Sequence, residues 1–487
     1  MENFWDFNVW SAFNILAVLL ISLLVANVLR RSIKFLRNSL IPVSVLAGAL
    51  LLLVASVYKL ITGEVMFDTA FFGGSGSVSL EIITYHCLAL GFIASTFKPS
   101  GQKLNKKRTS EIFNTGLQTV STYLIQAIVG LGISLLAILA IPSFFKAAGI
   151  LLPFGYGQGT GQALNYGGIF ETEYGFDGGK SFGLTIAALG FISASIGGVI
   201  HLNILKKKGK IKVLDKKDAA LKSEDIESEN EIPMQESIDK LTIQIALIAL
   251  AYVVTFLLMF GLGKLIPGMK SVIFGFNFLL GVISATLIKL LMNWLKKIKV
   301  IKKDYVNSFL MTRASNFFFD LMVVAGIAAI RLSALKNYWG VIIIMAVAGL
   351  LVTYFYNLLV SRTLFKDYPE EQFLMMYGML TGTACTGIIL LREIDGEFKT
   401  PAAENMVYQN FPAIVFGFPM MLLATLAPTK PIMTLLILVG LLAFIVILLF
   451  RSKIFRFKKK AATSAPDANV VENVTVEESG SSGETEE

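Results

Sequence analysis

Cysteine and histidine are nearly absent from this chain, which has two of each in 487 residues. So few thiols exclude a disulfide framework. The two histidines, His86 and His201, leave little for a zinc site or a catalytic triad, and neither an HExxH nor a GxSxG motif occurs. These absences argue against an enzyme, and we expect no metal centre and no organic cofactor.

Charge is also scarce, at 16% of residues against 55% hydrophobic, whereas soluble domains carry about 25% charged residues. The run FNILAVLLISLLVANVL at 13–29 has no charge at all, and runs of roughly 18 apolar residues or more indicate transmembrane helices. The net charge of +9 lies in short loops beside such runs, so it does not indicate a nucleic-acid partner. The sequence predicts an all-α polytopic membrane protein with eleven spans: 11–29, 40–60, 79–97, 112–140, 182–204, 240–262, 271–293, 306–330, 338–361, 404–427 and 430–450.

The order of charges around the first span predicts the orientation. Glu2 and Asp6 precede it and Arg30 and Arg31 follow it, which is the reverse of a cleavable signal peptide. With the N-terminus outside and one crossing per span, every Lys/Arg-rich loop falls on the cytoplasmic side, as the positive-inside rule requires. We therefore expect a protein of the inner (cytoplasmic) membrane, with its N-terminus outside and its C-terminus in the cytoplasm.

Two polar segments divide the chain. The segment 205–239 runs from basic to acidic and predicts a charged cytoplasmic linker, and 451–487 predicts a disordered cytoplasmic tail. The expected domains are an N-terminal membrane repeat (1–204), a C-terminal membrane repeat (240–427) and one extra transmembrane helix (428–450).

Two further segments are apolar enough to enter a membrane but too broken to cross it. They are about 146–170, with the motif YGQGTGQA at 156–163, and 372–391, with YGMLTGTA at 377–384. A single offset of 221 residues aligns the tyrosine, two glycines, the threonine and the alanine of the two motifs. Each interior glycine costs a helix about 1 kcal/mol relative to alanine, which favours a non-helical tip.

The predicted topology puts these segments on opposite sides of the membrane, as an inverted-topology repeat would. Each repeat would hold five transmembrane helices and one re-entrant glycine-rich hairpin. Broken backbone is tolerated at membrane depth where protein or a watery cavity surrounds it, and the half-helix ends at such a break can bind ions. The alternative is a close helix–helix packing patch of the small-xxx-small type, since Gly157-x-x-x-Gly161 and Gly378-x-x-x-Gly382 fit that template. Packing alone does not explain Pro153, the polar residues between the glycines, or the doubling of the motif.

With GQGTGQA after the fourth span, its counterpart before the tenth, and LIPVSVLAGALLL at 40–52, the chain resembles the bacterial sodium/glutamate symporter family over roughly residues 11–427. The resemblance implies symport of an anionic amino acid with Na⁺ and paired re-entrant loops. Family members typically carry Gly-His-Gly-Thr-Gly in the first loop, where this chain has Gln158, and a glycine where it has Leu380. The extra span and the long tail are further departures.

Polar residues inside spans supply the remaining site candidates. Asp320 lies in mid-span with Asn316 four residues earlier on the same helix face, so the pair is a candidate for binding Na⁺, or Asp320 for carrying a proton. The alternative for Asp320 is a neutral or paired structural carboxyl group. The candidate substrate-binding residues are Gly157, Gln158, Gly159, Thr160, Gly161, Asn165, Gly378, Thr381, Gly382, Thr383, Thr386, Gln409 and Asn410.

The predicted function is Na⁺-coupled symport of glutamate or a similar anionic amino acid. An alternative is Na⁺- or H⁺-coupled transport of a di- or hydroxycarboxylate such as citrate or malate. A membrane-embedded enzyme and a channel are disfavoured, because no catalytic motif is present and a channel would repeat its pore unit across subunits. The expected partners are the anionic substrate, Na⁺ and membrane lipid, and a homodimer is a candidate assembly.

Overall fold

Helices make up the regular structure of this computed structural model, which describes residues 3–97, 105–209, 231, 238–396 and 399–451. The only β-type pairing among these residues is an isolated bridge between Glu231 and Asp304. Most of the predicted linker 205–239 and nearly all of the predicted tail 451–487 lie outside the described residues. The expected all-α fold is confirmed for the described part of the chain.

Ten of the described helices are long and apolar enough to cross a membrane, and a bent pair makes an eleventh candidate. The pair is α16 (Ala402–Tyr408) and α17 (Asn410–Leu426), which meet at 53°. Ten of the eleven expected spans thus match single candidate helices, and the expected span 404–427 matches the bent pair, with ends shifted by a few residues. The ten single helices are α1 (Phe7–Ser32), α3 (Val43–Thr62), α4 (Gly76–Phe97), α5 (Lys106–Ala140), α7 (Gly179–Lys207), α9 (Lys240–Leu265), α11 (Asn277–Lys297), α12 (Ser308–Ala328), α13 (Trp339–Leu364) and α18 (Pro431–Leu449).

The shorter helices fall into two kinds. The first kind consists of the broken elements that match the two glycine-rich segments: α6 (Leu151–Tyr174), and the pair α14 (Pro369–Thr381) and α15 (Ala384–Arg392). The second kind connects the spans: α2 (Lys34–Asn38), η1 (Met66–Asp68), η2 (Ala70–Phe72), η3 (Ala148–Ile150), η4 (Pro267–Met269), α10 (Lys270–Gly275) and η5 (Leu332–Leu335).

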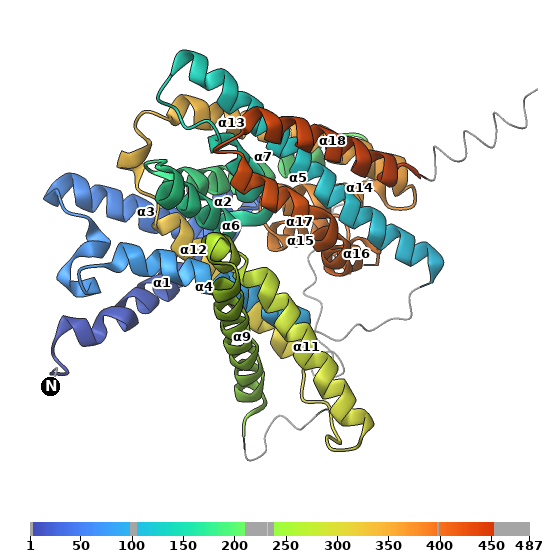
Figure 1. Ribbon diagram of the computed structural model, residues 1–487, viewed down its shortest axis with the longest axis horizontal. Helices are drawn as coiled ribbons and strands as arrows, with labels where there is room; N and C mark the ends of the chain where they lie inside the picture. Colours follow the sequence, from blue (N-terminus) through green and yellow to red (C-terminus); the bar gives the residue numbers. More distant parts are fainter. Residues whose placement is uncertain (1–2, 98–104, 210–230, 232–237, 397–398, 452–487) are drawn as a thin grey trace, which may run out of the picture.

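The long helices pack as two groups (Figure 1). The first group contains α1, α3, α4, α9, α11 and α12. The second contains α5, α7, α13, α17 and α18 together with α6, α14 and α15. The groups meet chiefly where α6 packs against α4 and α12, so the first broken helix lies at the seam between them.

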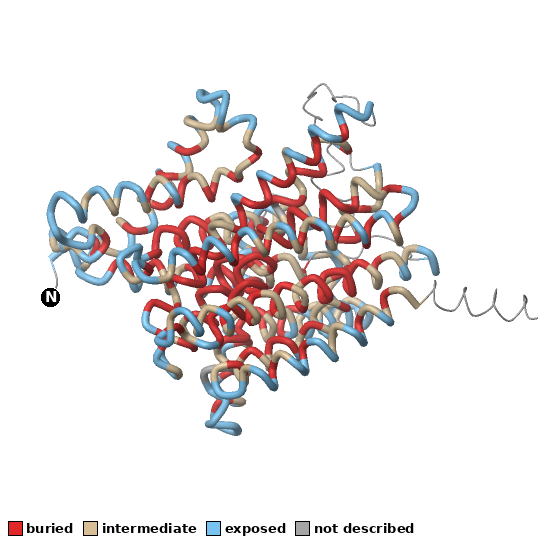
Figure 2. The backbone as a smooth tube through the Cα atoms, turned by 90° about the horizontal axis from the view of Figure 1, so that it is seen from above, coloured by how far each residue is buried: buried red, intermediate tan, exposed pale blue. Residues whose placement is uncertain are grey.

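Burial separates the interior of this assembly from its rim (Figure 2). In the most apolar 18-residue stretch of α7, 67% of the residues are buried, against 22% in the corresponding stretches of α1 and α18. Large side chains such as Leu436 and Ile447 of α18 are 68% and 61% exposed, as expected for a surface that lipid covers. The central position of α7 lets it contact both broken elements.

Candidate functional site

The α6 helix turns back on itself at Gly159. This residue has φ 79° and ψ −169°, a conformation that is essentially restricted to glycine. The rings of Phe154 and Tyr166 stack with their centroids 3.8 Å apart, although twelve residues of straight helix would separate them by about 18 Å. The two arms of α6 therefore lie side by side, and Gly159 is the tip between them.

The α14 and α15 helices form the matching reversal. Gly382 ends α14 with φ −140° and ψ −105°, and Thr383 is the N-cap residue of α15. A Cβ atom built on Gly378 would lie 2.7 Å from the Gly387 Cα, so the two arms touch backbone to backbone. Glycine at 378 allows this close approach, which any larger residue would prevent.

The two tips lie against each other. A Cβ atom built on Gly159 would lie 3.5 Å from the Thr383 Cγ2 and 3.8 Å from the Gly382 carbonyl oxygen. The two reversals, 221 residues apart in sequence, are thus neighbours in the interior.

Aligned tyrosines of the two motifs hold both reversals to the same point of α7. The Tyr156 hydroxyl is 2.8 Å from the Ser193 hydroxyl and donates to the Ala346 carbonyl at 2.6 Å. The Tyr377 hydroxyl donates to the Ser193 carbonyl at 2.7 Å. Both tyrosines are fully buried, so these hydrogen bonds fix the register of the two reversals through one residue.

A ladder of buried polar side chains joins α5 to α13 beside the tips. Each helix contributes three polar residues spaced four apart, all fully buried: Gln118, Thr122 and Gln126 on α5, and Thr353, Asn357 and Ser361 on α13. The Gln118 Nε2 donates to Asn357 Oδ1 at 2.9 Å, and the Gln126 Nε2 donates to Thr353 Oγ1 at 2.8 Å. The Gln126 Nε2 also reaches the Leu380 carbonyl at 2.9 Å, which ties the ladder to the second tip.

Three buried amide atoms around the tips have no hydrogen-bond partner among the described residues. They are the donors Gln158 Nε2 and Gln162 Nε2 and the acceptor Gln126 Oε1. An unsatisfied buried polar group costs roughly 1–3 kcal/mol, so native proteins rarely leave one without a partner. Two donors and one acceptor therefore remain unsatisfied by the described residues near the tips.

The predicted threonines differ in the hydrogen bonds that their hydroxyl groups make. The Thr160 hydroxyl donates to the Met322 carbonyl of α12 at 3.3 Å, and the Thr381 hydroxyl donates to the Tyr377 carbonyl at 2.6 Å. The Thr383 and Thr386 hydroxyls are 3.5 Å apart. Of the remaining motif glycines, Gly157 accepts a hydrogen bond from Tyr123 at 3.1 Å and Gly161 packs against Leu88.

Three predicted residues bond elsewhere. Asn165 donates to the Gly275 carbonyl at the end of α10. The Gln409 Oε1 accepts from the Thr119 hydroxyl at 2.9 Å, and the Gln409 Nε2 donates to Asn410 Oδ1 at 3.2 Å. These side chains join helices around the site. Asn165 also reaches the Gln162 Oε1 at 3.4 Å, three residues beyond the Gly159 tip, and the Gln409 Nε2 lies 3.7 Å from the Met379 sulfur of α14.

The structure also separates Asp320 from the tips. The Asp320 carboxyl group lies beside Ser44 in the first turn of α3, and Asn316 lies one turn before it on α12. The tip contacts of α12 come from Met322, whose carbonyl accepts from Thr160, and from Gly326, which packs on Thr160. Because Asp320 and Met322 are two residues apart, their side chains point to nearly opposite sides of the helix.

Sequence reasoning missed the ladder and the Tyr–Ser193 contacts. A signal for the ladder was present, because Gln118, Thr122 and Gln126 recur every fourth residue and so share one helix face. Ser193 carried no such signal, since a lone serine in an apolar helix does not reveal its neighbours.

Ionic clusters hold the outer ends of the two reversals. His201 Nε2 lies 2.9 Å from Glu370 Oε2 at the start of α14, and Arg362 bonds the other carboxylate oxygen at 2.9 Å. At the far end of α6, Lys180 pairs with Glu81 at 2.7 Å. The predicted tip residues themselves are all uncharged, so an anion there would meet dipoles and not fixed cations.

Comparison with known proteins bears on the same residues. The family model described as sodium/glutamate symporter matches residues 8–394, which are 387 of the 487 residues and include both reversals. No curated protein and no solved structure matches the chain. Because the family model covers about four-fifths of it, this chain belongs to the sodium/glutamate symporter family.

Proposed function

We propose that this sodium-coupled symporter carries glutamate, or a similar anionic amino acid, and binds it where the breaks of α6 and α14–α15 meet. The observation that carries the proposal is the contact of the Gly159 tip with Gly382 and Thr383. Broken helices at membrane depth occur where protein or a watery cavity surrounds them, and transporters place substrate sites there.

In this proposal the reversals are the re-entrant hairpins of two inverted repeats. The grouping of helices supports it: the first three spans of each repeat (α1, α3, α4 and α9, α11, α12) form the first group. The fourth span, the reversal and the fifth span of each repeat (α5, α6, α7 and α13, α14–α15, α17) lie in the second. The N-terminus is then outside and the C-terminus cytoplasmic, and the domain boundaries follow the two repeats.

The chemistry of the tips suits a zwitterionic dicarboxylate. The helical arms that start after Gly159 and at Ala384 direct backbone N–H groups toward the seam, and such groups bind carboxylates. Gln158 Nε2 and Gln162 Nε2 add two donors, and Gln126 Oε1 adds an acceptor for the substrate ammonium group. The arms that end at the tips present carbonyl oxygens, which are ligands for Na⁺.

Asp320, with Asn316 and Ser44, is in this proposal a second ion-coupling centre. It lies on the α3 side of α12, while Met322 and Gly326 of the same helix contact Thr160 at the first tip. A carboxylate inside the membrane is costly and therefore usually marks a functional site, and Na⁺ prefers the oxygen ligands that these side chains offer. The α12 helix would connect this ion-coupling centre to the substrate site at the two tips.

Uptake into liposomes tests the proposal. The purified full-length protein is reconstituted, an inward Na⁺ gradient is imposed, and uptake of labelled glutamate, aspartate, malate and citrate is measured. We expect Na⁺-dependent glutamate uptake, with no uptake under an equal K⁺ gradient or with Gly159→Ala protein. Saturable uptake of malate or citrate without glutamate would assign the site to di- or hydroxycarboxylates, and a lack of Na⁺ dependence for all four would refute the proposal.

A further inference from the structure

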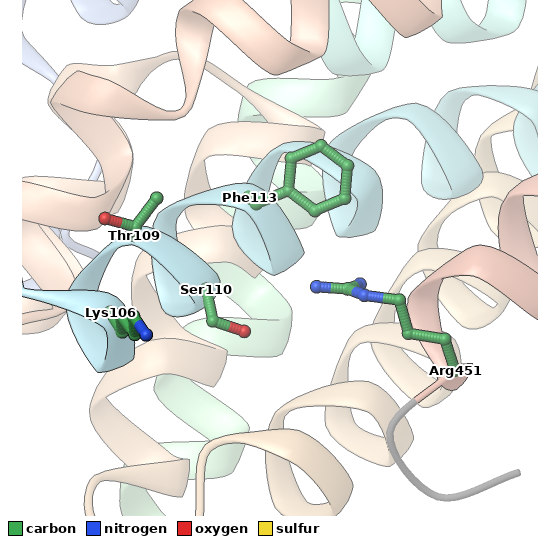
Figure 3. Close-up of a pocket in the computed structure, with 5 residues that line it drawn as sticks. All are labelled: Lys106, Thr109, Ser110, Phe113 and Arg451. Atoms are coloured by element: carbon green, nitrogen blue, oxygen red, sulfur yellow. The ribbon is translucent and has the colours of Figure 1, made fainter. Parts of the chain in front are cut away.

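The extra helix α18 lies beyond the family match, which ends at residue 394, and outside both proposed repeats. It packs along α5. At their shared end is a pocket of about 480 Å³, lined by four residues from the first two turns of α5 and by Arg451 just beyond α18 (Figure 3). The α5 residues are Lys106, Thr109, Ser110 and Phe113. Arg451, which α18 carries to this end of α5, therefore completes the lining of the pocket.

Among the described residues, the cations of the pocket have no carboxylate partners, unlike their neighbours. Lys107 pairs with Asp367 at 2.8 Å, and Arg108 pairs with Glu404 at 2.9 Å. In the described part of the chain, Lys106 and Arg451 form no ion pair. Arg451 is held in place by neutral groups, because its Nη1 donates to Asn114 Oδ1 at 2.9 Å and to the Leu448 carbonyl at 2.8 Å.

The position of Arg451 leaves part of its guanidinium available. Both hydrogen bonds use Nη1, and the group lies 4.9 Å from the Phe113 ring centroid. Figure 3 shows it pointing toward α5, on the side where the Ser110 hydroxyl lies. Burial lowers the pKa of Arg451, so an anion beside it would offset an unfavourable environment.

The first turn of α5 adds to the positive potential. It contains Lys106, Lys107 and Arg108, although the N-terminus of a helix already carries a partial positive charge. Asp367 pairs with Lys107, and Glu111 and Glu404 pair with Arg108, so Lys106 is the cation of this turn that has no carboxylate partner in the described chain. Cations at this end are unfavourable unless an anion balances them. A phosphate group would satisfy Lys106, Arg451 and the Ser110 hydroxyl together.

The pocket lies where two candidate spans end. The adjoining surface of α18 is apolar, with Phe444 and Ile447 53% and 61% exposed. A soluble phosphate would use only the charged end of this surface, whereas a phospholipid would use both parts.

We propose that Lys106, Ser110 and Arg451 bind the phosphate of an anionic phospholipid, with its acyl chains against α18. This site is independent of the transport activity proposed above. It gives the extra helix a function: it completes a lipid site that α5 alone would not form.

Native mass spectrometry tests the site on full-length protein in nanodiscs of phosphatidylcholine with a minor fraction of phosphatidylglycerol. We expect Lys106→Gln and Arg451→Gln each to weaken retention of phosphatidylglycerol by on the order of fivefold, since one basic residue near a membrane contributes about 1 kcal/mol. Lys107→Gln, which removes the same charge one residue away, should retain the lipid like the wild type. Ser110→Ala provides a test that leaves all charges in place and should also weaken retention.

Equal loss in all three charge variants would show diffuse surface attraction and overturn the proposal, as would unchanged retention in Lys106→Gln and Arg451→Gln. A melting experiment in detergent separates the two sources of phosphate. Phosphatidylglycerol should raise the melting temperature of the wild type more than that of Arg451→Gln, and millimolar inorganic phosphate should raise neither. A matching rise with inorganic phosphate would assign the pocket to a soluble anion and refute the lipid assignment.

Discussion

Tyr156 and Tyr377 occupy aligned positions of the two glycine motifs, and both hydrogen-bond to Ser193 of α7, one through its hydroxyl and the other through its carbonyl. A single residue of the most buried span thus positions both reversals. The contact of Gly159 with Gly382 and Thr383 follows from this shared attachment. Changes at the tyrosines should therefore affect both tips together.

The shared attachment predicts energetic coupling between the two tyrosines. Tyr156→Phe and Tyr377→Phe should each lower the free energy of unfolding by about 1 kcal/mol, because each removes a buried hydrogen bond. In the double variant the two effects should depart from additivity by at least about 0.5 kcal/mol, since both changes act on Ser193. Thermal or denaturant unfolding in detergent measures the cycle.

Tyr174→Phe is the matched control, because Tyr174 donates to the Thr425 carbonyl at 3.1 Å and not to Ser193. Paired with Tyr156→Phe, it should give additive effects. Additivity in the Tyr156–Tyr377 pair as well would contradict a common anchor.

Gly159→Ala should abolish transport. The φ of 79° with ψ of −169° is strained for any residue with a Cβ by about 1–3 kcal/mol, so the tip would move away from Thr383. Gly175→Ala is the control, since its φ of 68° and ψ of 28° lie in the left-handed region, where alanine costs about 1 kcal/mol. Uptake assays and melting curves on both variants test this prediction. Equal uptake by the two variants would show that the Gly159 tip is not part of the substrate site.

Gln158→Leu should affect stability and affinity in opposite directions. The change removes a buried donor that has no partner in the described chain, so the melting temperature should not fall. If Nε2 binds a substrate carboxylate, the KM for glutamate should rise at least about tenfold, because a hydrogen bond to a charged group contributes roughly 1.5–3 kcal/mol.

The comparison for Gln158 is Gln409→Leu, which breaks the 2.9 Å hydrogen bond from Thr119. That variant should melt earlier while its KM stays near the wild-type value. A KM unchanged in Gln158→Leu would exclude the amide from substrate binding.

Asp320→Asn tests the ion-coupling centre. We expect the Na⁺ concentration for half-maximal uptake to rise at least about tenfold, since the carboxylate charge that would hold the ion is lost. The glutamate KM at saturating Na⁺ should change little, because Asp320 lies on the α3 side of α12. Asp367→Asn removes an exposed carboxylate that pairs with Lys107 and should leave the Na⁺ dependence unchanged; the same shift in both variants would refute a specific role.

Acidification should release the start of α14. Glu370, which lies outside the candidate spans, is partly buried, which raises its pKa, but the hydrogen bond from His201 and the charge of Arg362 together lower the pKa to about 2. A depressed folded-state pKa stabilises the protein above the unfolded value near 4.5, and this contribution is lost as the pH falls toward 2. Glu370→Gln should therefore lower the melting temperature at pH 7, and the difference from the wild type should shrink below about pH 4.5; a difference independent of pH would contradict this assignment.

Local properties of the sequence were enough to predict the spans and the two breaks. Long apolar runs must be helical in lipid because no water satisfies the backbone there, and the eleven expected spans correspond to described helices. The glycines of GQGTGQA likewise marked a break, because the conformation at Gly159 depends on that residue's own lack of a Cβ. Even the polar ladder on α5 left a periodic signal in Gln118, Thr122 and Gln126.

Which residues meet was decided only by tertiary packing. Gln409 and Asp320 looked equivalent to Gln158 in the sequence, yet Gln409 bonds to Thr119 and Asp320 lies beside Ser44. The side of a helix that faces a given neighbour depends on the rotation of both helices, and a one-residue difference turns a side chain by about 100°. Sequence therefore determined that the chain spans a membrane and breaks twice, and packing decided which polar groups surround the place where the breaks meet.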